Sequence, residues 1–130
     1  MQAGRLQELY DRYKDRVQFF IVYIHEAHAA DGRSPIRVNT SKLEWISEPK
    51  SAFERFQVAN TCIEDLKLTI PCLLDDMENA TDKAYSGWPD RLYLVGKDGR
   101  IAFQGRPGPR GFRPEELAAA IGVELKKIGG

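Results

Sequence analysis

Two imidazoles and a carboxylate directly follow an apolar run, in the stretch "YIHEAHAADG". Histidine and glutamate are common general acids and bases, so Glu26 and His28 are candidates for proton-transfer chemistry. The alternative is structural, because polar residues often end a strand and Glu26 and His28 can hydrogen-bond each other or the next loop. The residue types alone leave both interpretations open.

A metal site is the less favoured chemistry. The pattern His25-x-x-His28 differs from the HExxH spacing of zinc enzymes. Asp75 and Asp76 are adjacent, so their side chains point to opposite sides of a strand. No spacing in the chain supplies a set of ligands, and we expect no bound metal.

An apolar strand positions these candidates. Residues 17–24 are apolar on both alternating faces, which is typical of a central strand covered on both sides. In open α/β sheets, ligands bind beyond the carboxyl ends of parallel strands. His25 and the residues after it are therefore expected at an end of the sheet where sites form.

Apolar periodicity predicts helices over residues 2–15, over residues 50–66 and starting at Pro114. Acidic residues begin the last of these helices and lysines end it, which matches the helix dipole. "LTIPCLLDD" indicates a short strand whose proline favours an edge. "ENATDKAYS" indicates a short helix capped by Asp76 or Asn79. Two strands joined by the turn residues Asp98-Gly99 predict a hairpin. The expected core stripes are Phe53, Phe56, Ala59, Cys62, Ile63 and Leu66 in the second helix and Leu117, Ile121, Leu125 and Ile128 in the last.

The order helix, strand, helix, strand, short helix, hairpin, helix is an α/β layout. It matches the later part of a three-layer thioredoxin-like fold, which we expect as one domain over residues 1–130. That fold begins with a central strand that leads into the first helix. Here the first predicted element is helix 2–15, whose apolar residues recur at helical spacing from its start and follow no capping signal. With the first strand missing, strands 17–24 and 91–96 should share a sheet without hydrogen-bonding each other. "PCLLDD" should then lie on the far side of strand 17–24.

Composition limits the class of protein. The chain has 130 residues, and 19 Lys+Arg balance 19 Asp+Glu, which argues against a nucleic-acid-binding protein. No apolar run approaches the roughly 20 residues of a membrane span, and no signal-peptide pattern is present. With Met1 as the true start, the expected location is cytoplasmic.

The two cysteines show no redox motif. Cys62 and Cys72 are not spaced as CxxC, and both lie among apolar residues. We interpret them as small buried hydrophobes. A role for one of them as a resolving thiol is the alternative.

Longer motifs carry a resemblance to a known family. "FFIVYIHEAHAADG", "PCLLDDMENA" and "AYSGWPDRLYLVGKDGRIAFQGRPGPRGFRPEEL" together resemble the iodothyronine deiodinases, in particular their bacterial deiodinase-like members. The likeness covers most of the chain from about Leu6 and is weakest between Arg33 and Lys50. It implies a thioredoxin-like fold related to peroxiredoxins. It also implies reductive dehalogenation of an iodinated phenol, or a related thiol redox reaction, by a selenocysteine or cysteine nucleophile.

The resemblance also implies roles for single residues. Glu26 and His28 match the family's "EAH" and become catalytic candidates, while Asp31 of "DG" becomes a substrate-binding candidate. Arg91 matches the arginine of "ERLY", where a guanidinium can stabilise an anionic nucleophile or a substrate phenolate. The alternative for Arg91 is a surface ion pair with Asp90, which would contribute little.

Pro89 aligns with the cis-proline of thioredoxin-like proteins, so we expect a cis bond and contact between backbone groups and substrate. His25 occupies a variable position of the family and is expected at the surface. His28, Glu26 and Arg91 should converge at one end of the sheet, near the start of the first helix.

Two departures from the family bear on its substrate. Arg33 stands where the family usually has tryptophan, and a second family histidine has no counterpart, so thyroid-hormone specificity is not implied. A basic set could flank the site and favour anionic substrates, although a solvated edge is the favoured interpretation. It comprises Arg100, Arg106, Arg110 and Arg113.

The family's nucleophile is expected a few residues before Met1. We therefore expect an incomplete reading frame, cut after a selenocysteine UGA or a cysteine codon, and an inactive chain as given. The resemblance implies no bound cofactor, a small-molecule substrate, an external thiol reductant or thioredoxin-like donor, and a homodimer as an option. Neither nucleic acid nor membrane is an expected partner. The alternatives are a peroxiredoxin-like or general thiol oxidoreductase, and a non-catalytic thioredoxin-like module that binds a partner at its open strand edge.

Overall fold

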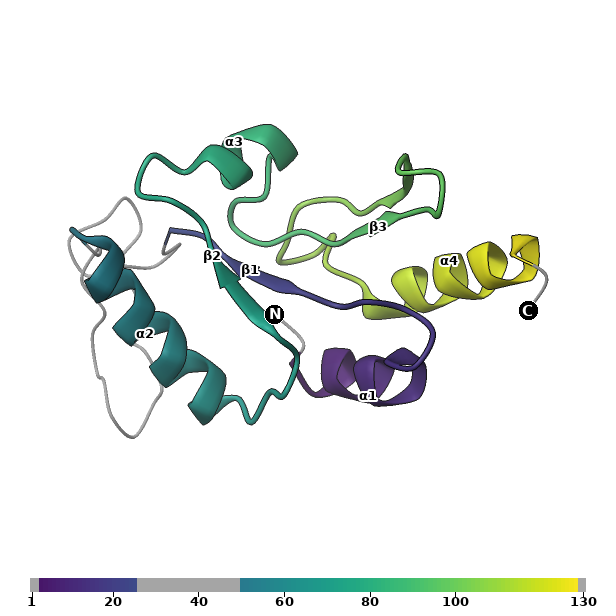
Figure 1. Cartoon of the computed structure of the whole chain (residues 1–130), viewed down its shortest axis with the longest axis horizontal. Coiled ribbons are helices and arrows are strands. Elements are labelled where there is room, and N and C mark those ends of the chain that lie inside the picture. The colour runs from purple at the N-terminus through teal and green to yellow at the C-terminus, as the bar shows by residue number, and fades with distance from the viewer. Residues whose placement is uncertain (1–2, 26–49, 129–130) are drawn as a thin grey trace.

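The helices and strands follow one another along the chain in the predicted order. The computed structural model describes residues 3–25 and 50–128. In this part the elements are α1 (Ala3–Tyr13), β1 (Ile21–Tyr23), α2 (Ala52–Asp65), β2 (Cys72–Leu74), α3 (Ala80–Tyr85), β3 (Tyr93–Val95), β4 (Ile101–Gln104) and α4 (Pro114–Lys127). This mixture of helices and small sheets is compatible with an α/β fold (Figure 1).

The strands form two separate pairs. β1 and β2 are parallel, with Ile21 opposite Cys72 and Tyr23 opposite Leu74. β3 and β4 are antiparallel and form the predicted hairpin. Its turn includes Gly99 at φ 81°, a conformation that glycine adopts without a steric penalty.

No backbone ladder joins β1 to β3 within the described residues, as predicted, but the two strands belong to separate two-stranded sheets and do not share the one sheet that was expected. β2 lies on β1 as expected for "PCLLDD". The strand predicted over residues 17–24 is, however, only three residues long. Its ladder begins where the Ile21 N–H donates to the Pro71 carbonyl, at 2.9 Å. Pro71 has no N–H of its own, so the pairing cannot continue toward residue 17.

Local signals account for the helix ends. The Ser51 side chain accepts a hydrogen bond from the Glu54 N–H at 3.1 Å, which caps the start of α2. At the start of α3, the Ala80 N–H donates to the Asp76 carboxylate at 3.0 Å. Asn79 occupies the N-cap position but makes no side-chain cap bond, so Asp76 is the acceptor of the two predicted candidates.

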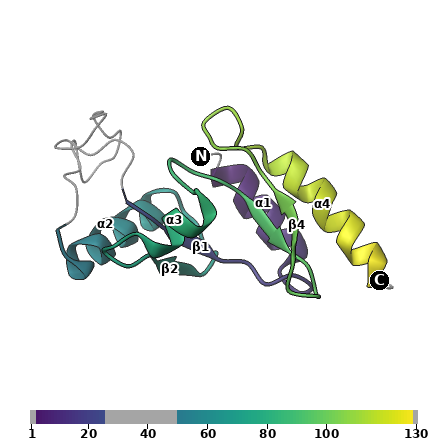
Figure 2. The same ribbon diagram turned by 90° about the horizontal axis from the view of Figure 1, so that it is seen from above.

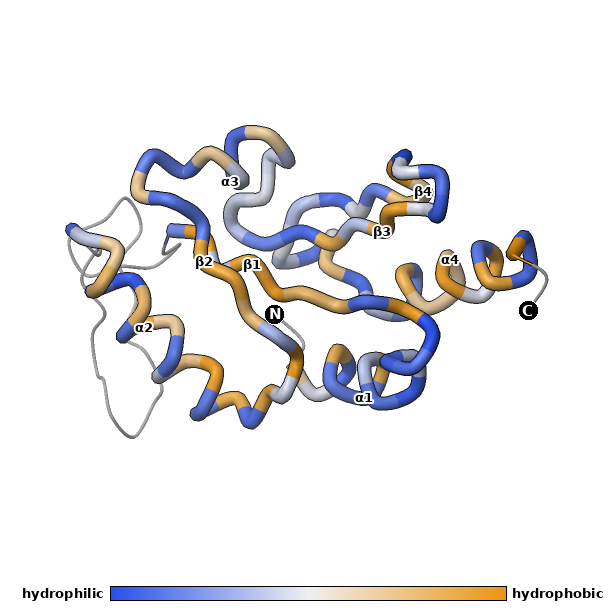
Figure 3. Tube along the Cα trace, viewed as in Figure 1, coloured by the Kyte–Doolittle hydropathy of each residue, from blue (hydrophilic) through white to orange (hydrophobic). Residues whose placement is uncertain are grey.

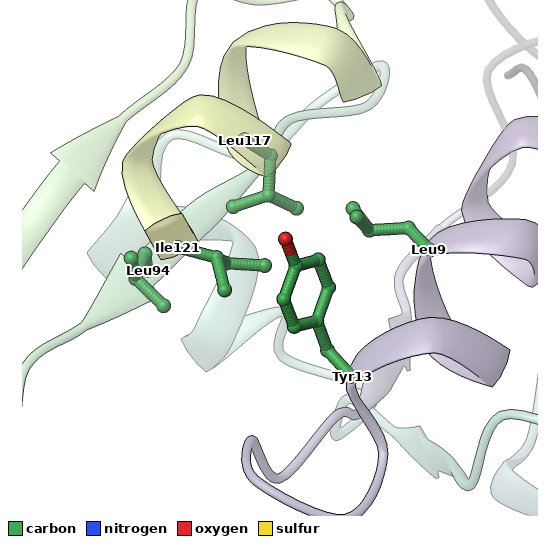
Figure 4. Packing of buried hydrophobic residues seen from close by; sticks show 5 residues of the cluster. All are labelled: Leu9, Tyr13, Leu94, Leu117 and Ile121. Carbon is green, nitrogen blue, oxygen red and sulfur yellow. The ribbon is translucent and has the colours of Figure 1, made fainter. Parts of the chain in front are cut away.

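The main core lies between α1, α4 and the hairpin. Figure 4 shows its buried side chains pointing toward one another from α1, α4 and β3. They are Leu9, Tyr13, Leu94, Leu117 and Ile121. A second cluster joins α1 to the segment before β2 and to the loop before α4, through Leu6, Leu68, Ile70 and Phe112. Figure 2 shows α1 and α4 near the hairpin and α2 near the other strand pair.

Two predicted burial patterns are wrong. Phe53 and Phe56 of α2 are 67% and 52% exposed, because the face of α2 that turns inward carries Arg55 and Ala59 instead. At the end of α4, Ile128 is 50% exposed because it lies beyond the last turn that packs on the hairpin.

The strand predicted to be covered on both sides also differs. β1 and β2 form a largely hydrophobic pair in Figure 3, yet Val22 and its partner Leu73 are 37% and 49% exposed. α2 packs against β2, and the described residues provide no comparable cover for these two side chains.

Candidate functional site

Three of the five predicted site residues, Glu26, His28 and Asp31, lie outside the described residues. Their convergence with Arg91 therefore stays a prediction. Pro89 and Arg91 are described, and both lie in the segment that connects α3 to β3. Figure 1 shows this segment near the carboxyl ends of β1 and β2.

The peptide bond between Trp88 and Pro89 is cis, as predicted. The bond between Gly108 and Pro109 is also cis, which the sequence did not indicate. The two segments are in contact, since the Gly108 N–H donates to the Asp90 carbonyl at 2.9 Å. The loop between β4 and α4 thus lies directly against the residues that follow Pro89.

Arg91 is tied to the backbone on two sides. Its Nε donates to the Gly105 carbonyl at 2.6 Å, and its Nη1 donates to the Ser86 carbonyl at 3.2 Å. The guanidinium also lies 5.8 Å from the centre of the Tyr93 ring. Both bonds go to neutral carbonyls, so the guanidinium keeps its positive charge in a fixed place and can stabilise a nearby anion.

Asp75 organises the turn that leads into α3. Its side chain is 5% exposed and accepts the N–H groups of Asp76 at 2.9 Å, Thr81 at 2.8 Å and Asp82 at 2.9 Å. Burial alone would raise the pKa of Asp75, but the hydrogen bonds from Asp82, Thr81 and Asp76 together lower it. Asp75 is therefore a structural carboxylate, and no group of metal-binding side chains exists among the described residues.

Arg55 holds the same turn from the other side and was missed in the sequence. Its side chain is 1% exposed and donates to the carbonyls of Asp75 at 3.2 Å and Asp76 at 2.6 Å, and to the Asn79 side chain at 3.0 Å. A signal was present in the sequence, because Arg55 lies one helical turn before the buried Ala59 and so shares its face.

The predicted surface position of His25 is wrong. Its side chain, expected at the surface, is only 27% exposed. The Nε2 atom lies 2.8 Å from Oδ2 of Asp82, and the ring stacks on the indole of Trp88 with centroids 5.9 Å apart and an interplanar angle of 11°. The reason is that the end of β1 lies beside α3, where Asp82 supplies a carboxylate partner for the imidazole. The sequence alone does not predict a partner so far along the chain.

The cysteines offer no evident nucleophile. Cys62 and Cys72 are both half-buried and neither forms a disulfide. Burial raises the pKa of the Cys72 thiol, which disfavours the reactive thiolate. The described part of the site thus contains a guanidinium held by two carbonyls and a hydrogen-bonded imidazole, and the thiol of Cys72 is not an activated one.

Comparison with known proteins gives a consistent set of relatives. The chain is 31% identical to a type I iodothyronine deiodinase of Xenopus laevis, over 97% of this chain and 46% of that protein. It is 32% identical to a thyroxine 5-deiodinase of Sparus aurata and 33% identical to that of Homo sapiens, in both cases over 89% of this chain. These alignments cover 41% and 36% of the two relatives, so the chain spans less than half the length of these proteins.

The comparisons also correct the expected location. The prediction of a cytoplasmic location is wrong, because the matched relatives are iodothyronine deiodinases, which are membrane-anchored enzymes. In residues 3–25 and 50–128, no helix is both long enough and apolar enough to cross a membrane. The prediction failed because it inferred a location from the lack of an apolar run in this chain.

The sequence profile of one family matches almost the whole chain. It is described as iodothyronine deiodinase, and the match covers residues 1–124. This range includes the end of β1, the Asp75 turn, cis-Pro89, Arg91 and all but the last turn of α4. The chain belongs to the iodothyronine deiodinase family.

Proposed function

We propose that this chain carries the charge-stabilising and proton-donating part of a deiodinase-like oxidoreductase, which uses a selenol or thiol to remove iodine reductively from an iodinated phenol. In the proposal, Arg91 stabilises an anionic nucleophile or substrate phenolate, and His28 donates the proton with Glu26 as its partner. Pro89 and Asp31 contact the substrate. An external thiol, or a thioredoxin-like donor, restores the nucleophile.

The observation that carries the proposal is the setting of Arg91. Its guanidinium is held by the Gly105 and Ser86 carbonyls, two residues after cis-Pro89. A cation fixed in advance stabilises developing negative charge without further reorganisation. Family membership supplies the reaction class for which such a cation is suited.

The nucleophile in this proposal is a selenocysteine or cysteine that precedes residue 1 in the full-length protein. The elevated pKa of the Cys72 thiol argues against that residue as the attacking group. We also propose a thioredoxin-like arrangement, in which one further strand lies between β1 and β3. The separate strand pairs support it, since such a strand would join them into one sheet.

The test uses the full-length protein with cysteine at the nucleophile position, an iodinated phenol and excess dithiol, and it measures iodide release. Arg91→Ala should lower the rate by about a hundredfold, in the range found when a preorganised charge-stabilising donor is removed. Arg91→Lys should retain an intermediate rate, because it keeps the charge but loses the paired donors.

Arg100→Ala is the matched control, since Arg100 is exposed beside the hairpin turn and its removal should leave the rate unchanged. Circular dichroism of each variant confirms that it is folded. Absence of iodide release, combined with rapid turnover of peroxide, would replace the proposal by a peroxiredoxin-like activity.

A further inference from the structure

We propose that His25 is a positioning residue of the candidate site. Held by Asp82, its imidazole fixes the indole of Trp88 and thereby the cis segment that leads to Arg91. The activity part of this proposal rests on the proposed function, whereas the contacts themselves do not.

Asp82 connects three parts of the chain. Its Oδ2 lies 2.8 Å from Nε2 of His25 at the end of β1, and its Oδ1 accepts the Trp88 backbone N–H at 2.8 Å. Its own N–H donates to Asp75 at 2.9 Å, which fixes the start of α3. The carboxylate is 12% exposed, so water competes weakly for these bonds.

The indole of Trp88 depends on this imidazole for its orientation. The indole Nε1 is buried and has no hydrogen-bond partner among the described residues, so no polar contact of the indole with this part of the chain holds the ring. The nearly parallel stack on His25, at 5.9 Å and 11°, is the ring contact that does so. Loss of the imidazole would therefore release the side chain of the residue that precedes Pro89.

Asp82 also determines where the imidazole carries its hydrogen. A carboxylate only accepts hydrogen bonds, so Nε2 must be the protonated nitrogen when it faces Oδ2. In Asp82→Asn, the remaining carbonyl oxygen can still accept from the Trp88 N–H. The amide NH₂ then faces His25, and the imidazole must present an unprotonated Nε2.

The first experiment measures the chemical shifts of the imidazole nitrogens by NMR in residues 1–130. The His25 signals are assigned by their loss in His25→Leu. We expect hydrogen on Nε2 in the wild type and on Nδ1 in Asp82→Asn at a pH where the ring is neutral. A purely space-filling role would leave the tautomer unchanged. The same tautomer in both proteins would overturn the pairing.

The second experiment probes Trp88 by fluorescence. The chain has two tryptophans, so Trp45→Phe is introduced in every variant to leave Trp88 as the single tryptophan. His25→Leu should increase acrylamide quenching of the Trp88 fluorescence at least twofold, whereas His25→Gln should give a smaller increase because it keeps a donor for Asp82. Asp76→Ala is the control, since it removes the bond to the Ala80 N–H without touching the pair. Equal quenching in all variants would overturn the stacking role.

The third experiment follows iodide release by the full-length protein. His25→Leu should raise KM about tenfold, with a smaller effect on kcat, which corresponds to one lost hydrogen bond to a charged group. His25→Gln should restore most of the affinity, and Asp76→Ala should not change KM. An unchanged KM in His25→Leu would overturn the positioning role. If the unmodified full-length protein shows no turnover, the proposed function fails, and the tautomer and quenching results still decide whether His25 positions Trp88.

Discussion

Asp75 shows how one buried carboxylate can replace an ordinary helix cap. Asn79 stands at the N-cap of α3 but is left-handed, at φ 61°, and makes no side-chain cap bond. The Asp75 oxygens instead accept the N–H groups of Asp76, Thr81 and Asp82, two of which belong to the first turn of α3. The chain that leads to cis-Pro89 therefore depends on a side chain from the end of β2.

Replacing Asp75 by Asn should lower the free energy of unfolding by about 2 kcal/mol at neutral pH, because its amide presents a donor to backbone N–H groups. The hydrogen bonds of Asp82, Thr81 and Asp76 outweigh burial and hold the pKa of Asp75 below its ordinary value of 3.8. The stabilisation is thus complete above the unfolded-state pKa and is lost as the pH falls through the lower folded-state pKa.

Urea unfolding of the wild type and of Asp75→Asn, from neutral pH down to acid, checks this prediction. The difference between the two proteins should be largest at neutral pH and should shrink once the wild-type carboxyl is protonated. A difference that is constant across the whole range would mean that the charge of Asp75 is not what stabilises the turn.

Single residues were predictable where they belong to a local or family pattern. Pro89 has the expected cis bond, and Arg91 lies beside it. Arg55 and His25 were not predicted, because their burial depends on partners far away in the sequence. The partner of His25 is 57 residues away, and Arg55 bonds to residues more than 20 positions later. Residue type alone does not reveal such partners.

At the scale of elements, the helices follow their sequence signals more closely than the strands do. The helices predicted over residues 2–15 and 50–66 are observed as Ala3–Tyr13 and Ala52–Asp65. A helix satisfies its own backbone, so local periodicity and capping suffice. A strand needs the backbone of a partner, and the predicted strand 17–24 is reduced to Ile21–Tyr23 because its pairing stops at Pro71.

Two glycines in different elements should respond oppositely to alanine. A Cβ at Gly111, in the loop after β4, would lie 2.5 Å from the Pro107 carbonyl oxygen and 2.6 Å from the Arg106 Cβ. Gly111→Ala should therefore destabilise the protein by about 1–3 kcal/mol through overpacking. Gly122 lies within α4, and apart from the helix's own backbone no atom of the described residues lies within 4 Å of a new Cβ, so Gly122→Ala should stabilise the protein by about 0.5–1 kcal/mol.

Thermal denaturation of the two variants beside the wild type measures both effects, and each serves as the control for the other. Equal shifts in Tm would contradict the prediction, as would a Gly111→Ala variant as stable as the wild type. The result bears on the site, because the Gly111 loop packs against the residues that follow cis-Pro89.

At the scale of the whole molecule, the two strand pairs are held together by side chains. Phe19 and Leu92 pack against both hydrophobic clusters, whereas no backbone ladder crosses from β1 to β3 in the described residues. Val22 and Leu73 on the first pair and Val95 and Ile101 on the second are all substantially exposed. The sequence predicted the lack of direct pairing between β1 and β3, because its pattern lacked the strand that would lie between them, but the shared sheet that it also predicted is not observed in the described residues.

Residues 1–130 alone should release no iodide from an iodinated phenol and should reduce neither peroxide nor disulfide. The proposed nucleophile is absent from them, and burial raises the pKa of the Cys72 thiol. Turnover assays with excess dithiol check this expectation. Activity of the short chain that disappears in Cys62→Ser or Cys72→Ser would move the nucleophile to a residue that we interpret as structural.

The proposed additional strand can be tested at a single backbone amide. In β1, the Ile21 N–H and the Tyr23 carbonyl point toward β2, so the Val22 N–H between them points the opposite way, where the additional strand would lie. Hydrogen exchange at Val22 should be fast in residues 1–130 and at least tenfold slower in the full-length protein, because a new partner would hold its N–H. Ile21 is the control, since its N–H already donates to Pro71 at 2.9 Å and should be protected in both proteins. Equal exchange at Val22 in the two proteins would show that no strand pairs with this edge of β1, and the thioredoxin-like arrangement would then be wrong.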